Sequence, residues 1–192
     1  VQTVSSRRFN DADPAVFGPG TLTIELGTYT GSPTISGFDA KAGATAVTVT
    51  LGAEDDTLAE VRDKINAANA GVTATVINDA NGARLAIRSK DSGAENGFRI
   101  TAAETTDDGV ATNGLSALAF DAQAASPMTF NQRAANALAT INGIDVESAS
   151  NTLTDVSDGV TLKLVKTTTA PVEVTVAADS TAVKTAVEDF VK

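Results

Sequence analysis

The sequence contains no cysteine, no histidine and no tryptophan, and Tyr29 is its one tyrosine. Without cysteine and histidine the chain cannot form a Ser-His-Asp or Cys-His catalytic site, and it lacks the usual ligands of zinc. Sugar-binding clefts depend on aromatic side chains, which make up only 4% of these residues. We therefore expect a non-catalytic protein with no catalytic residue, no cofactor-binding residue and no metal ligand.

The balance of charge is acidic, with 14 basic and 24 acidic residues and a net charge of −10. This balance argues against a nucleic-acid partner, because phosphate contacts need a basic surface. No apolar run reaches the about 18 residues of a membrane-spanning helix, so we expect no membrane insertion. The 34 alanines and 27 threonines favour a stiff, β-rich surface protein over an enzyme with a pocket.

The 192 residues suffice for one large domain or two small ones. Most segments alternate apolar and polar residues with a period of two, which is typical of strands that bury one face. The Asn81-Gly82 and Asn142-Gly143 pairs are turn signals, and each predicts a hairpin. Strands are predicted over seven ranges: 21–26, 46–51, 72–77, 83–88, 98–101, 160–165 and 172–176.

One helix is predicted from residue 57 onward, because Thr57 and Glu60 form a T-x-x-E capping box. Asp55 and Asp56 precede it, at the positive end of the helix dipole. A metal site at residues 54–56 is the alternative, but no further carboxylates follow at calcium-loop spacing. Three apolar residues are expected to share the buried face of the helix: Leu58, Val61 and Ile65.

Other stretches carry weaker patterns. Residues 102–128 are polar and rich in turns, with a weak apolar patch at 115–120 and a predicted linker at 123–127. Residues 151–156 are predicted as a turn. Residues 181–192 space their apolar side chains as a helix does, without a stop signal, so we expect a helix that continues beyond the chain. The alternative is a short amphipathic helix that packs on its own domain.

Three groups of side chains are candidates for a site. Tyr29, in a predicted turn at 27–31, is the candidate for stacking on a sugar. Arg84 and Arg88 share one face of a predicted strand and, with Lys90, form the densest basic group. These cations are solvated, paired to carboxylates across strands, or in contact with a partner. Several carboxylates fall in predicted turns or loops, where capping or solvation is expected instead of catalysis: Asp79, Asp91, Asp107, Asp108, Asp145 and Asp155.

Residues 49–61 and 145–156 look alike. Each runs from a strand end through a polar turn into Thr-Leu-x-Glu-Val or Thr-Leu-x-Asp-Val. The similarity predicts two related β-rich units and not a long solenoid, which needs at least about three repeats.

The order of these motifs resembles a known family. Residues 57–67, 71–79 and 84–90 resemble the central region of the bacterial flagellar cap family, FliD or hook-associated protein 2. The later hairpins of that family and its short flagellin hook motif are similar to residues 141–146, 150–156 and 159–164. The resemblance spans nearly the whole chain. Other flagellar hook-associated proteins share the hook motif, so they stay open as alternatives.

The resemblance implies a fold that is mainly β with minor α (α+β), with short capping helices. Two β-rich domains are expected, one inserted into the other. The inserted outer head domain is expected at 20–128, and the host head domain at 1–19 plus 129–182. Residues 183–192 are then the start of a leg helix that forms a coiled coil beyond the chain.

The resemblance also implies a structural function in a filament cap, a ring-shaped homo-oligomer that helps exported flagellin assemble at the filament tip. The expected partners are other copies of the chain and flagellin. The expected location is outside the cell, at the flagellum tip, after export without a cleaved signal peptide. We expect this chain alone to be mainly monomeric, because the legs are absent. The alternative is an extracellular adhesin that binds a glycan or a host protein.

Overall fold

A computed structural model describes residues 1–10, 16–157 and 159–175. The described part consists mainly of antiparallel strands, with one α-helix and two short 3-10 helices. The expected class, mainly β with minor α, is thereby confirmed. The expected leg helix at 183–192 lies outside the described residues. None of the described helices is long and apolar enough to cross a membrane.

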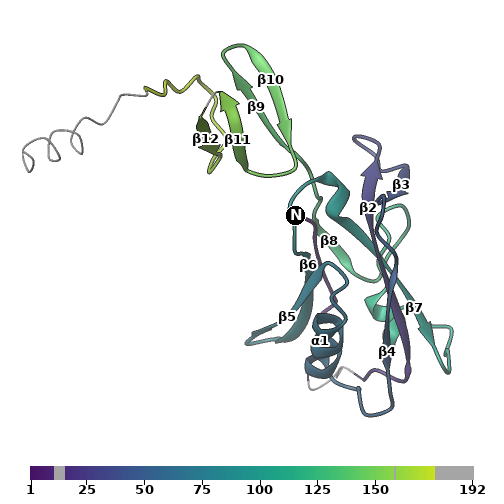
Figure 1. Cartoon of the computed structure of the whole chain (residues 1–192). Coiled ribbons are helices and arrows are strands. Elements are labelled where there is room, and N and C mark those ends of the chain that lie inside the picture. Colours follow the sequence, from purple (N-terminus) through teal and green to yellow (C-terminus); the bar gives the residue numbers. More distant parts are fainter. Residues whose placement is uncertain (11–15, 158, 176–192) are drawn as a thin grey trace, which may run out of the picture.

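The first sheet has four antiparallel strands in the order β5-β6-β1-β8 (Figure 1). The prediction of a hairpin at 72–88 is confirmed, although its two-residue turn is Ala80-Asn81 and Gly82 is already paired with Asp79. The central strand β1 could not be found by alternation, because it has only three residues. The strands are β1 (Thr3–Ser5), β5 (Val72–Asp79), β6 (Gly82–Ser89) and β8 (Thr129–Gln132).

This sheet joins residues that were expected in different domains. In the expected division, β1 and β8 belong to the host domain and β6 belongs to the inserted one. In the structure β1 lies between the other two, with Val4 opposite Ile87 and Thr3 opposite Gln132. The division into domains at residues 20 and 128 stays a prediction. The pairing of β1 with both β6 and β8 means that one continuous sheet contains strands from both expected domains.

The second sheet is built around β2 (Gly20–Thr30), which is longer than its predicted range. On one edge β2 pairs with β7 (Gly97–Glu104), and on the other edge with β4 (Val47–Leu51) and then β3 (Gly37–Ala40). The predicted turn around Tyr29 is wrong, because Tyr29 pairs with Phe38 of β3. The short β3 gave no alternation from which the sequence could predict this pairing.

The helix α1 (Leu58–Ala67) packs mainly against β5. Its capping box is confirmed, since the Thr57 hydroxyl accepts a bond from the Glu60 backbone N–H, and the Thr57 N–H donates to the Glu60 carboxylate at 3.0 Å. Two 3-10 helices, η1 (Ala94–Asn96) and η2 (Leu115–Leu118), follow later in the chain. The three residues predicted on the buried face of α1 are at most 7% exposed: Leu58, Val61 and Ile65.

The core of the body formed by β1–β8 lies between the two sheets and α1, and it contains a cluster of aromatic rings. The ring centroids of Phe120 and Phe130 lie 5.3 Å apart, and Tyr29 and Phe98 each lie 6.3 Å from Phe120. The apolar patch at 115–120, which looked weak in sequence, belongs to this core. Leu115 on η2 is fully buried, and Phe120 bridges to β7.

Two hairpins, β9–β10 and β11–β12, form a smaller unit (Figure 1). The Asn142-Gly143 turn is confirmed, with both residues at positive φ, as a tight hairpin turn requires. The predicted turn at 151–156 is wrong for residues 152–156, because these belong to a strand with a register shift near Asp155, at φ +53°. The strands are β9 (Ala137–Ile141), β10 (Ile144–Ser148), β11 (Thr152–Ser157) and β12 (Val160–Lys163).

The strand predicted at 172–176 is wrong for residues 172–175, and residue 176 lies outside the described part. Val172 and Val174 are 69% and 63% exposed, and residues 172–175 have no paired strand in the part of the chain that the structure describes. A strand needs a neighbour for its backbone hydrogen bonds, so alternation alone did not suffice.

A short connection at 133–136 links the smaller unit to the body of β1–β8 (Figure 1). The Arg133 guanidinium donates to the backbone carbonyls of Tyr29 and Gly31 at the end of β2. The Asn136 side chain accepts a bond from the Ala94 N–H at 2.7 Å. These contacts fix the point at which the chain leaves the body.

Candidate interaction surfaces

The first sheet has one open face, which we call the basic face. Leu85 and Ile87 point into the core and are fully buried, so their neighbours on β6 point the other way. Register places Arg84 opposite Ile77, which is 54% exposed, and Arg88 opposite Thr73. The prediction that the two arginines share a strand face is confirmed. The basic face consists of Thr73, Thr75, Ile77, Arg84, Ala86 and Arg88.

The arginines of the basic face differ from the others in the described part of the chain. Arg8, Arg62 and Arg99 each form an ion pair, with N–O distances of 2.7 to 2.8 Å. Arg84 and Arg88 make no ion pair or hydrogen bond with any described residue, and the Arg84 Nε is buried without a partner. Pairing to carboxylates across strands, one of the three alternatives from sequence, is therefore wrong.

Lys90 does not extend the basic face. It follows the end of β6, and its ammonium donates to the side-chain oxygen of Asn69 at 3.2 Å. The basic group predicted from sequence thus divides into two unpaired arginines on the sheet and one lysine beside α1.

The outer side of the β9–β10 hairpin forms a second surface, which we call the acidic face. Leu138 is 75% exposed and lies opposite Glu147, and Thr140 lies opposite Asp145. The Asp145 carboxylate accepts a bond from the Thr140 hydroxyl at 2.8 Å, and the Glu147 carboxylate accepts one from Asn136 at 2.6 Å. Both partners are neutral, and no described cation pairs with either carboxylate. The acidic face is Leu138, Thr140, Asp145 and Glu147.

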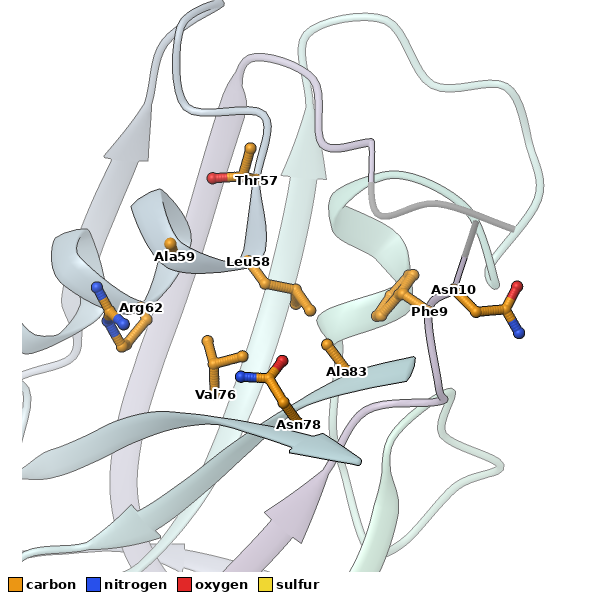
Figure 2. Close-up of a pocket in the computed structure, with 9 residues that line it drawn as sticks. All are labelled: Phe9, Asn10, Thr57, Leu58, Ala59, Arg62, Val76, Asn78 and Ala83. Atoms are coloured by element: carbon orange, nitrogen blue, oxygen red, sulfur yellow. The ribbon is translucent and has the colours of Figure 1, made fainter. Parts of the chain in front are cut away.

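A groove of about 510 Å³ lies between α1 and the tip of the β5–β6 hairpin (Figure 2). Buried side chains of Phe9 and Leu58 form part of its apolar floor. Arg62 lines the groove, and Asp63 holds its guanidinium by two bonds of 2.8 and 2.9 Å. Among the described residues that line the groove, Arg62 is the one charged side chain, and it is already paired with Asp63.

The free edge of β5 borders this groove. The Asn66 amide donates to the Ala74 carbonyl at 2.9 Å and accepts from the Ala74 N–H at 2.8 Å. In this way a helix side chain replaces a neighbouring strand. The backbone N–H and C=O groups of every second residue of an antiparallel strand point to the same edge. Those of Val76 and Asn78 therefore point, like those of Ala74, to the edge of β5 that borders the groove. Figure 2 shows both side chains below α1.

Three carboxylates, Glu104, Asp107 and Asp108, have oxygens within 4.8 Å of one another, a grouping that the sequence did not predict. Glu104 accepts a bond from the Ser116 N–H at 2.6 Å. Asn113 and the Val110 N–H bond to Asp108 and lower the pKa of its carboxyl group. Asp107 accepts a bond from the Gly109 N–H at 2.8 Å. All three carboxylates thus bond to groups between β7 and the start of η2, and these bonds account for their positions.

The acidic residues before α1 also have a structural role. Asp55 accepts a bond from the Gly52 N–H at 2.8 Å and pairs with the Lys64 ammonium at 3.0 Å. The bond from Gly52, and then the contact with Lys64, lower the pKa of Asp55. This arrangement favours the helix-terminal interpretation of residues 54–56 over the metal site.

Tyr29 does not offer a surface for a sugar. Its side chain is 3% exposed, and its hydroxyl donates to the Phe98 carbonyl and accepts from the Ala122 N–H. Burial raises the pKa of this phenol above its ordinary range. Each described phenylalanine is likewise buried or packed against the core: Phe9, Phe17, Phe38, Phe98, Phe120 and Phe130.

The carboxylates considered for catalysis are not brought together. Asp79 pairs with Arg8 at the tip of the β5–β6 hairpin, and Asp91 follows the other end of β6. Asp145 and Asp155 lie within β10 and β11, and the prediction that they are turn residues is wrong.

Comparison with known proteins gives two family models. The model described as the flagellin hook IN motif matches residues 21–91. The model described as the C-terminus of flagellar hook-associated protein 2 matches residues 134–192. Curated relatives include the B-type flagellar hook-associated protein 2 of Pseudomonas aeruginosa, which is 36% identical over 194 residues. That alignment covers 94% of this chain and 37% of the relative, so the chain spans about a third of its length.

Solved structures agree with the sequence relatives. FliD (HAP2) from Pseudomonas aeruginosa PAO1 superposes with a TM-score of 0.69 at 31% identity, over 99% of this chain and 80% of that chain. The D1-D2-D3 domains of the flagellar cap protein FliD from Escherichia coli give a TM-score of 0.74 at 29% identity, over 99% and 51%. These relatives are structural flagellar proteins, not enzymes, in agreement with the non-catalytic protein expected from this sequence. The chain belongs to the FliD family, the flagellar hook-associated proteins 2.

Proposed function

We propose that the chain forms the head of a flagellar filament cap and acts as a structural part without catalysis. The observation that carries this proposal is the similarity to FliD of Pseudomonas aeruginosa, which extends over 99% of the chain. The proposed domain organisation is the one expected from sequence, with residues 20–128 inserted between 1–19 and 129–182. A leg helix would begin at residue 183.

The proposed mechanism is mechanical. A ring of heads at the filament tip limits the diffusion of flagellin subunits away from the tip, and the legs make the moving contacts. The packed core of the body supports this role, because close-packed interiors deform little under load. The proposed partners are further copies of the chain and flagellin, and the proposed location is the flagellum tip, reached without a cleaved signal peptide.

The proposal is tested by deleting the gene. The culture medium is assayed for unpolymerised flagellin, and the cells are examined for filaments. Short or missing filaments with leaked flagellin, both restored by the intact gene, are the expected result. Normal filaments without leakage would overturn the proposal.

A further inference from the structure

Two surfaces of this chain are complementary, and neither has an ionic partner among the residues that the structure describes. The basic face carries two unpaired arginines and the exposed Ile77, and the acidic face carries two carboxylates without a cation and the exposed Leu138. We propose that the basic face of one copy docks against the acidic face of a neighbouring copy. The inference rests on the proposed cap function and names the contact between its heads.

The basic face is unusual in a chain with a net charge of −10. Carboxylates are plentiful, and each of Arg8, Arg62 and Arg99 pairs with one, although the Arg8 Nε, like that of Arg84, has no partner among the described residues. A buried polar nitrogen without a partner, such as the Arg84 Nε, is costly, so such groups call for an explanation. An incoming carboxylate would give the guanidinium groups of Arg84 and Arg88 the anion that they lack in the described part of the chain, and an aliphatic side chain beside it would cover Ile77.

The acidic face presents that combination. Asp145 and Glu147 are two residues apart on β10, so their side chains leave the same side of the strand about 7 Å apart. Leu138 lies directly opposite Glu147 and is 75% exposed. An exposed leucine beside carboxylates without a cation matches an exposed isoleucine beside arginines without an anion.

The two faces lie on different parts of the chain, one on the body of β1–β8 and one on the smaller unit, and they do not meet in the structure. We therefore assign the contact to two copies. The basic face belongs to β5 and β6, and the acidic face belongs to the unit that begins after the connection at 133–136 (Figure 1). The contacts of β9 and β10 are chiefly with each other. A surface that meets a different surface on the next copy is heterologous, and heterologous contacts close into rings when the rotation fits.

The contact is expected to be weak between isolated chains. Exposed ion pairs contribute little individually, and each face offers one large aliphatic side chain. In an assembled cap, further contacts would hold the heads at high effective concentration, and a weak contact then suffices to set their register. A mainly monomeric chain at low concentration is therefore compatible with this docking.

Cross-linking tests the geometry, because the chain has no cysteine of its own. One preparation carries Ala86→Cys on the basic face, and a second carries Thr140→Cys on the acidic face. The two are mixed at high concentration and joined with a short bis-maleimide. The matched control replaces Thr140→Cys by Thr161→Cys, an exposed threonine of β12 in the other hairpin.

The mixed 86–140 product is expected to exceed the 86–161 product by about fivefold, which is what one exposed ion pair contributes at most. The excess should shrink between about 10 mM and about 1 M salt, where the screening length falls from about 30 Å to about 3 Å. Equal yields of the two products at low salt, or a predominant 86–86 product, would overturn the proposal.

Charge reversal tests the chemistry. Arg84→Glu with Arg88→Glu, or Asp145→Lys with Glu147→Lys, should each abolish the excess of the 86–140 product. Mixing the two reversed chains should restore it. Circular dichroism checks that each variant is folded, and Arg84→Gln with Arg88→Gln provides a milder second variant. An excess that is unchanged in the folded variants would overturn the proposal.

The same reversals in the gene separate this inference from the proposed function. If gene deletion leaks flagellin, the reversed variants should leak it too, and the combined reversal of both faces should reduce the leakage. Deletion that leaks flagellin while the reversed variants build normal filaments would overturn the docking and leave the cap function standing. Deletion without leakage would overturn the cap function, and the cross-linking result would then decide the docking alone.

Discussion

The side chain of Asn66 is predicted to contribute more to stability than its position on a helix surface suggests. It forms two hydrogen bonds with the backbone of Ala74, of 2.9 and 2.8 Å, across the edge of β5. Ala74 is 3% exposed, so its N–H and C=O have little access to water. In Asn66→Ala both backbone groups lose their partner at once.

The magnitude follows from the cost of unsatisfied groups. A buried donor or acceptor left without a partner costs about 1 to 3 kcal/mol. Two such groups would give about 2 to 6 kcal/mol, and the adjoining groove lets water reach part of this edge. We therefore expect Asn66→Ala to lower the free energy of unfolding by about 2 to 4 kcal/mol.

Urea unfolding of the purified chain measures this loss. Asn66→Asp keeps the acceptor for the Ala74 N–H but turns a carboxylate oxygen toward the Ala74 carbonyl oxygen, so it should also lower the stability. Asn78→Ala is the matched control, because Asn78 lies on the same strand edge, is exposed, and makes no side-chain bond with a described residue. It should cost less than about 0.5 kcal/mol, as surface substitutions do.

Backbone amide exchange gives an independent measurement. The Ala74 N–H should exchange much faster in Asn66→Ala than in the unaltered chain, whereas the amides of β6 should change little. The reasoning would be refuted if Asn66→Ala and Asn78→Ala had the same stability within about 0.5 kcal/mol.

Three further predictions concern the core and α1. Leu118→Ala removes a fully buried side chain and should cost about 2 to 5 kcal/mol in urea unfolding; a loss below about 1 kcal/mol would contradict its place in the core. Thr57→Ala removes the capping bond to Glu60 and should cost about 1 kcal/mol in thermal unfolding, whereas Thr57→Ser should cost less; equal losses would argue against the cap. The pKa of Asp55 lies below its ordinary 3.8 in the folded chain, so its carboxylate stabilises the fold above about pH 4. This stabilisation is lost as the pH falls through the lowered pKa. Asp55→Asn should therefore be less stable near about pH 7 and approach the unaltered chain in acid, and a difference that is constant with pH would contradict the contacts of Asp55.

Local patterns in the sequence predicted the elements that depend on local contacts. Alternation located β4, β5 and β6, and the Thr57–Glu60 pair located the start of α1. The sequence did not predict β1, β3 and β8, because these strands have only three or four residues and are stabilised by pairing with other strands. For the same reason Tyr29 was expected in a turn, although β3 keeps it in a strand.

The candidate surfaces were predictable only in part. The spacing of Arg84 and Arg88 placed both on one strand face, but the absence of any described ion partner could be learned only from the structure. The acidic face depends on the register that puts Leu138 beside Glu147. The register of β9 and β10 was predictable from the Asn142-Gly143 turn. The exposure of Leu138 was not predictable, because it depends on whether another part of the chain covers the hairpin.

The pairing of Thr3 with Gln132 determines how tension would pass through the chain. The chain enters the body at β1 and leaves it at β8, and these strands are antiparallel neighbours, so the two points of attachment lie side by side. A pull applied at these two points would first load the bonds of Gln2 and Arg133. It would then act on the backbone bonds next to residues 3 and 132, one after another, as a zipper opens. The helix α1 lies outside this force path, whereas the second sheet shares the load through the bonds of Gln2 to β7 and of Arg133 to the end of β2. The rest of the body would stay folded until β1 and β8 had separated.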